Sequence, residues 1–288
     1  MILQRFSPVC VWGSLFFLLT ACASDRGART SFGGGAEAAP KVSASVADEI
    51  AVGQEIHSQI ITGFQVYTKP EVVQYVEKIG RSLLSRVSRK ELPYQFTILY
   101  NEKIYATSAP GGFIYLTTGM LAFLDSEAEL AAVLAHEIGQ LQYQDPRFSH
   151  FKKNVEELTR AGSSVAPAFG SFGALAMLGL MMLNASLEQG VKTPEERLRA
   201  ADDAAFEYLL SAGYDPQAVM DVIGKFLRAE KKITPYFYDY YQARPITQER
   251  YAHLAAGFQG LDLTGKTLRT DPENYDEIMK PVFEIAEF

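Results

Sequence analysis

The sequence predicts an α+β fold that is mostly helical and carries a small β-sheet beside one central helix. Over most of the chain, for example after Pro70, apolar residues recur at intervals of three and four, which is the spacing of an amphipathic helix. Residues 94–100 alternate apolar and polar side chains, and residues 113–117 follow a Pro-Gly-Gly turn, so both segments are predicted strands. Residues 131–141 are largely apolar and follow a capping box that begins at Ser126, which predicts a buried central helix.

One main domain is expected at residues 48–256, followed by a C-terminal extension at residues 257–288. The chain has 288 residues, of which 48% are hydrophobic and 21% charged, a composition that supports one sizeable core. Its net charge of -7 gives no basic surplus, so nucleic acid is not an expected partner.

The N-terminus has the pattern of a lipoprotein signal peptide at residues 1–21. Arg5 precedes an apolar run at residues 9–19, and the tetrapeptide Leu-Thr-Ala-Cys that ends at Cys22 matches the bacterial lipobox. Cys22 is therefore the predicted lipid attachment site, with a plain secretory signal as the alternative. Residues 22–47 are rich in Gly, Ala and Ser and are interpreted as a flexible tether. By the enterobacterial sorting pattern, Ala23 favours the inner leaflet of the outer membrane, with the domain facing the periplasm.

A long uncharged segment runs from Ala161 to Leu187. It is long enough for a transmembrane helix, but Pro167 and three glycines interrupt it. An apolar helical hairpin or a lid on the domain is the favoured interpretation, and a segment that dips into the membrane is the alternative.

The predicted central helix carries most of a zinc-peptidase motif. In H-E-x-x-H the two histidines lie four residues apart, so they share one helical face and bind one zinc ion. The adjacent glutamate activates the zinc-bound water as a general base. Here the motif reads His136, Glu137 and Gln140, with a neutral amide at the second ligand position.

Several separated stretches extend this pattern: residues 52–56, 109–114, 126–139 and 211–216. On these stretches, residues 48–255 resemble the bacterial envelope metallopeptidases of peptidase family forty-eight, which are related to the CAAX prenyl proteases and mitochondrial Oma. The resemblance implies a zincin-like domain, zinc as the cofactor and cleavage of envelope polypeptides.

The resemblance also places the family's site residues on this chain. His136 is the surviving metal ligand, Glu137 the general base, and Arg250 matches a family arginine. The positions of the second His ligand, the third Glu ligand and a further active-site His are substituted, by Gln140, Ala200 and Arg244. Four good ligands bind structural zinc with about 10–16 kcal/mol, which is roughly 3–4 kcal/mol for each ligand. With His136 and one weak amide ligand, the expected binding free energy is about 4 kcal/mol, which corresponds to a dissociation constant near millimolar.

Two neighbouring groups are candidates to rescue a metal site. Glu196 and Asp203 lie one turn on either side of Ala200. Glu196 has an alternative role in the capping box that starts at Thr193. A further hypothesis is that Arg244 replaces the charge of zinc by pairing with Glu137; the alternative is that Arg244 is a solvated surface residue.

Two functions from different classes follow. The favoured one is a lipid-anchored pseudoprotease that binds unfolded or outer-membrane polypeptides, or a partner protease, through the inherited cleft and an edge strand at Gly111 and Gly112. The alternative for that strand is an ordinary core strand. The alternative is an active zinc metalloendopeptidase of envelope quality control, with improvised ligands beside His136. A passive structural lipoprotein is also compatible with the sequence.

Overall fold

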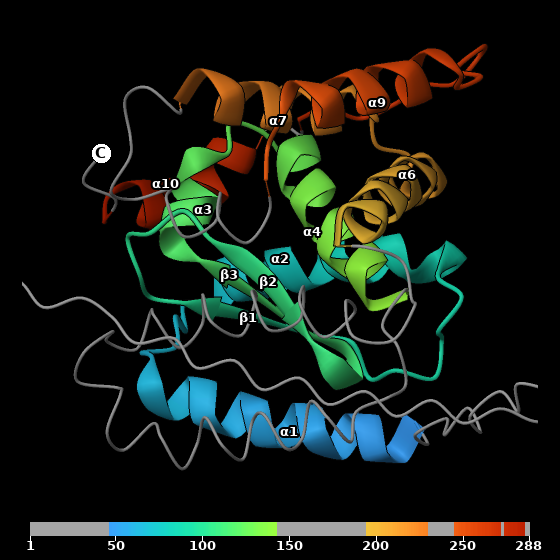
Figure 1. Cartoon of the computed structure of the whole chain (residues 1–288). Helices are drawn as coiled ribbons and strands as arrows, with labels where there is room; N and C mark the ends of the chain where they lie inside the picture. Colours follow the sequence, from blue (N-terminus) through green and yellow to red (C-terminus); the bar gives the residue numbers. More distant parts are fainter. Residues whose placement is uncertain (1–45, 143–193, 230–244, 272–273, 286–288) are drawn as a thin grey trace, which may run out of the picture. The chain divides into compact units, whose positions relative to one another are not determined.

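The structure, a computed structural model, describes residues 46–142, 194–229, 245–271 and 274–285 (Figure 1). The chain divides into the units Met1–Lys41 and Val42–Phe288, and every described residue belongs to the second. The predicted signal peptide, Cys22, the Ala161 to Leu187 segment and Arg244 lie outside the described residues.

The predicted α+β class is confirmed. The elements, in chain order, are α1 (Val46–Gly63), α2 (Pro70–Ser82), the short 3-10 helix η1 (Leu83–Arg86), β1 (Gln95–Leu99), β2 (Ala106–Ala109), η2 (Pro110–Gly112), β3 (Phe113–Thr117), α3 (Thr118–Phe123), α4 (Glu127–Gln142), α6 (Pro194–Ala212), α7 (Gln217–Ala229), α9 (Gln248–Gln259) and α10 (Tyr275–Phe283). Figure 1 shows the sheet between α1 and α4, with α6, α7 and α9 on the α4 side.

The sheet has three strands in the order β1-β3-β2. β1 runs parallel to β3, with Gln95 opposite Phe113, and β2 runs antiparallel to β3, with Ala109 opposite Phe113. Since β3 is paired on both sides, it is the central strand. Gly111 and Gly112 form the turn before it, at φ angles of 78° and 95° that favour glycine. The expectation of an edge strand at Gly111 and Gly112 is therefore wrong: the edges of this sheet belong to β1 and β2.

Helix α4 is the central helix, and every residue from Glu127 to Leu141 is buried. One half of the predicted capping box forms at its start: the Glu129 N–H donates to Ser126 Oγ at 3.2 Å. The Glu129 carboxylate reaches back one residue further than the N-cap, to the Asp125 N–H at 2.7 Å. Such a cap satisfies a free N–H group of the first turn, which matters for a helix that is buried along its length.

The C-terminal extension packs on the main domain. On α10 the side chains of Tyr275, Met279 and Val282 are fully buried, and the helix contacts α2 and α3. In the segment before it, Thr270 O accepts a hydrogen bond of 2.8 Å from the Ala128 N–H. The described part of residues 257–288 thus shares the core of the domain. Within the described ranges, no helix is long and apolar enough to cross a membrane.

Candidate functional site

The helices α4, α6 and α9 bring the predicted site residues together. His136 and Gln140 lie four residues apart on α4, so they share one face, as the motif requires. Gly139 lets α6 approach this helix closely, because a Cβ at that position would lie 2.8 Å from Ala201 O. Ala200 is buried on α6, and Arg250 is buried in the first turn of α9.

Both ring nitrogens of His136 have polar neighbours. The Gln140 amide nitrogen lies 3.2 Å from His136 Nε2, and Asp202 Oδ1 lies 2.7 Å from His136 Nδ1. An amide nitrogen only donates, so Nε2 acts as acceptor and the ring proton resides on Nδ1, facing the carboxylate. The Gln140 amide therefore takes the nitrogen that a metal at this motif would use.

Asp202 connects the site to α9. Arg250 donates to its carboxylate from Nε at 2.7 Å and from Nη2 at 2.8 Å, a bidentate pair in which Asp202 is 1% exposed. Burial alone raises the pKa of Asp202, but the Arg250 guanidinium and His136 outweigh it and hold the pKa well below its usual range. The carboxylate is therefore ionised at neutral pH.

Arg250 is itself positioned by the start of its helix. Thr247 is the N-cap of α9, and its hydroxyl accepts from the Arg250 N–H at 3.1 Å. One chain of close polar contacts, from Gln140 through His136 and Asp202 to Arg250, consequently links the three helices.

Asp202 is the site residue that sequence reasoning missed. It stands two residues after Ala200, in the Ala-Ala-Asp run that matches the family's Glu-Ala-Asp, and that match was the available signal. The neighbouring residue Asp203 is half exposed, and its Oδ1 lies 2.9 Å from Nε2 of His253 on α9. Glu196 is exposed in the first turn of α6.

Glu137 is fully buried on α4. The hypothesis that it pairs with Arg244 stays a prediction, because Arg244 is outside the described ranges.

The described donor set does not fit a zinc ion. Zinc at such sites takes three or four His, Cys, Asp or Glu ligands. Among residues 46–142, 194–229, 245–271 and 274–285, no three such side chains are grouped to hold a metal. Ala200 offers only a methyl group, and His136 Nε2 faces an amide nitrogen.

A buried helix carrying His136 and Glu137 beside a small mixed sheet, with a carboxylate of a second helix against the His136 ring, defines a metallopeptidase-type domain. The chain belongs to Peptidase family M48, whose sequence profile matches residues 70–257. The family in general is zinc-dependent.

Curated relatives carry one description. The beta-barrel assembly-enhancing protease of Escherichia coli K12 is 26% identical over 209 residues, which cover 68% of this chain and 42% of that protein. The Yersinia pestis protein of the same name is 28% identical over 185 residues, 63% of this chain and 38% of the relative. A putative protein of this kind from Vibrio cholerae is 24% identical over 183 residues, 61% and 37% of the two chains. The chain thus spans about two fifths of these relatives' length.

Proposed function

We propose that this protein is a pseudoprotease: a metallopeptidase-family domain that binds polypeptides without cutting them. The single observation that carries the proposal is the Gln140 amide donating to His136 Nε2, in the place of a metal ion. Asp202 Oδ1 lies 2.7 Å from the other ring nitrogen, Nδ1, so both nitrogens of His136 face polar atoms of the protein.

Energetics support this assignment. A zinc ion at His136 would have to displace the Gln140 hydrogen bond, and it would find a methyl group at Ala200. With one strong ligand at about 3–4 kcal/mol, its affinity would lie near millimolar. The buried bidentate pair of Asp202 and Arg250 meanwhile joins α6 to α9 through two hydrogen bonds between protein side chains.

We place the protein in the bacterial envelope as a lipoprotein. Acylation at Cys22 would tether the domain through residues 22–47, and Ala23 favours the outer membrane with the domain facing the periplasm. The ligands proposed are unfolded or outer-membrane polypeptides, or a partner protease, in keeping with the name of the relatives. The start of β1 at Gln95, and not the turn at Gly111 and Gly112, is where an extended chain would add by backbone hydrogen bonds. Further along β1, Ile98 O already accepts from the Tyr67 N–H, and every residue of β2 is buried.

An active zinc endopeptidase is the second candidate, and a specific observation favours it. Asp202 still orients the His136 ring as a carboxylate orients a metal-bound histidine, and Glu137 remains beside it. This candidate requires ligands from outside the described residues.

Casein cleavage and zinc content distinguish the two candidates. The soluble form from Ser24 to Phe288 is compared with Glu137→Gln, which removes the family's base. The proposal predicts neither cleavage nor stoichiometric zinc in the unaltered chain. Cleavage that Glu137→Gln abolishes, together with stoichiometric zinc, would instead establish the enzyme.

A rebuilt variant makes a negative result informative. Gln140→His with Ala200→Glu restores both missing ligands on the existing α4 and α6, and Asp202 remains in place for His136. Recovery of zinc binding in this variant would show that the assay and the fold are sound.

A further inference from the structure

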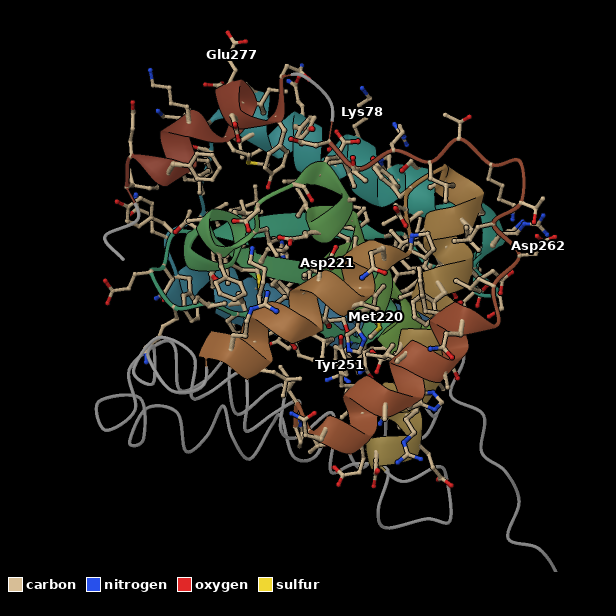
Figure 2. The ribbon with its side chains drawn as sticks, turned by 90° about the horizontal axis from the view of Figure 1, so that it is seen from above. Lys78, Met220, Asp221, Tyr251, Asp262 and Glu277 are labelled. Atoms are coloured by element: carbon tan, nitrogen blue, oxygen red, sulfur yellow. The ribbon has the colours of Figure 1, made fainter. Side chains whose placement is uncertain are left out.

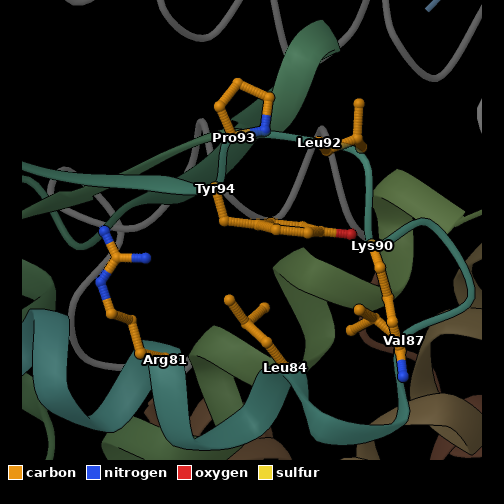
Figure 3. A pocket seen from close by; sticks show the side chains of 7 residues that line it. All are labelled: Arg81, Leu84, Val87, Lys90, Leu92, Pro93 and Tyr94. Carbon is orange, nitrogen blue, oxygen red and sulfur yellow. The ribbon is translucent and has the colours of Figure 1, made fainter.

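A second region of the domain has the features of a ligand site. A pocket of about 520 Å³ lies between η1 and the segment that leads into β1 (Figure 3). Its apolar lining includes Leu84, Val87 and Leu92, and the last two are buried. In Figure 3 the Tyr94 ring lies across the pocket opposite Leu84. The volume is within the range of about 300–1,000 Å³ typical of ligand pockets.

The aromatic wall of this pocket is fixed before any ligand arrives. The Tyr94 hydroxyl donates to Arg89 O at 3.0 Å and accepts from Gln142 Nε2 at 2.8 Å. The Gln142 side-chain oxygen accepts in turn from the backbone N–H groups of Ser88 and Arg89, each at 3.0 Å. Gln142 is the last residue of α4, so the wall is attached to the central helix of the domain.

The rim of the pocket is positively charged. Arg81 and Lys90 are exposed and stand at opposite ends of the pocket (Figure 3). Residues 77–91 contain five basic residues and two acidic ones, in a chain whose net charge is -7. The two acidic residues are Glu77, beside Arg81, and Glu91, beside Arg89. One of the five, Arg89, is already paired with Glu49.

Neither rim cation is held strongly by the protein. Arg81 pairs with Glu77 at 2.7 Å, but both side chains are about half exposed. Surface pairs of this i,i+4 kind contribute only about 0.3–0.5 kcal/mol. Within the part of the chain that the structure describes, Lys90 forms no ion pair.

We propose that this pocket binds a short acidic polypeptide segment in which an apolar side chain lies between two carboxylates. The apolar side chain would pack between Leu84 and Tyr94, and the carboxylates would pair with Arg81 and Lys90. Two cations separated by an apolar floor suit such a segment better than a lipid, whose charge lies at one end of its acyl chain. The proposal concerns a surface apart from His136 and stands whether or not the protein cleaves peptides.

The test is a binding titration on the soluble form from Ser24 to Phe288, with a fluorescent Gly-Ser-Glu-Leu-Glu-Ser-Gly peptide as the probe. The double variant Arg81→Gln with Lys90→Gln should weaken binding about tenfold or more, or ~1.4 kcal/mol at least. The matched control is Lys78→Gln with Lys266→Gln, which removes the same charge at exposed positions outside the pocket lining. Lys78 points away from the ribbon in Figure 2. Binding by the control should be nearly unchanged.

Two further arms test the apolar half of the site. Leu84→Ser keeps every charge and should also weaken binding, as should a probe with Ser in place of Leu. Equal weakening by the pocket and control variants would reduce the effect to net charge and overturn the proposal. No binding by the unaltered chain, or binding to phosphatidylglycerol vesicles in place of the peptide, would overturn it as well. Unchanged melting temperatures establish that the variants are folded.

Discussion

Replacing Asp202 by Asn should be among the most destabilising single changes in the described domain. The carboxylate is 1% exposed and makes three short polar contacts: two from Arg250, at 2.7 and 2.8 Å, and one from His136 at 2.7 Å. An asparagine of the same shape keeps one acceptor oxygen, but its NH₂ group faces a donor. Removing one partner of a buried ion pair costs about 3–5 kcal/mol, because the remaining charge is left uncompensated.

Urea unfolding of the soluble form from Ser24 to Phe288 measures this change. We expect a lower midpoint with an unchanged slope, which reports a stability difference between similarly compact states. A loss of about 3–5 kcal/mol leaves a folded protein if the starting stability is typical, about 5–15 kcal/mol.

The neighbouring residue supplies the control. Asp203 pairs with His253 at 2.9 Å, but the two side chains are 55% and 34% exposed. Asp203→Asn should therefore cost only about 0–1 kcal/mol. Equal effects of Asp202→Asn and Asp203→Asn would refute the assignment of Asp202 as the connection between α6, α4 and α9.

Three further predictions follow from the structure. Arg250 and His136 lower the pKa of Asp202 in spite of its burial. The contribution of Asp202 to the free energy of unfolding is therefore complete above its unfolded pKa of about 3.9 and is lost as the pH falls through the folded pKa. Urea midpoints measured down to acid pH should show a decline that Asp202→Asn lacks. Burial lowers the pKa of His57, which lies 3.0 Å from the Tyr115 hydroxyl. Just below pH 6.5 the unfolded chain therefore binds more protons than the folded one, and the free energy of unfolding should decrease as the pH is lowered through this range. The decrease should be smaller in His57→Gln. Gly139→Ala should lower the free energy of unfolding by about 1–3 kcal/mol in the same assay, because the new Cβ meets backbone atoms of Ala201. Gly224→Ala is the control: its Cβ meets only the flexible end of Arg228, so the free energy of unfolding should be nearly unchanged.

The parts of the fold that local chemistry determines could be predicted from the sequence. Thr193-Pro194 is a local start signal for a helix and Gly213 a local stop signal, and α6 runs from Pro194 to Ala212 with Gly213 at a φ of 80°. The capping box at Ser126 likewise predicted the start of α4. These signals act over one helical turn, so they need no knowledge of the tertiary structure.

The features that depend on distant contacts could not be predicted in the same way. β2 consists of Ala106-Thr107-Ser108-Ala109, small residues without strong alternation, and it is recognisable only by its pairing with β3. The central position of β3 follows from that pairing, which is why the edge-strand expectation failed. Asp202 and Arg250 lie 48 residues apart, and nothing local marks them as partners.

The candidate site shows the same division. The motif spacing predicted that His136 and Gln140 share one helical face, and in the structure the Gln140 amide nitrogen lies 3.2 Å from His136 Nε2. The sequence did not reveal the direction of that contact, in which the amide nitrogen faces the imidazole. The proposed function rests on that orientation.

Zinc affinity, measured by competition with a chromophoric chelator, tests this account most directly. The soluble form from Ser24 to Phe288 is titrated beside the variant Gln140→His with Ala200→Glu. The account predicts a dissociation constant near millimolar for the unaltered chain, about 4 kcal/mol of binding, and much tighter binding by the rebuilt variant. Nanomolar zinc binding by the unaltered chain, about 12 kcal/mol, would contradict it and would mean that residues outside the described ranges complete the site.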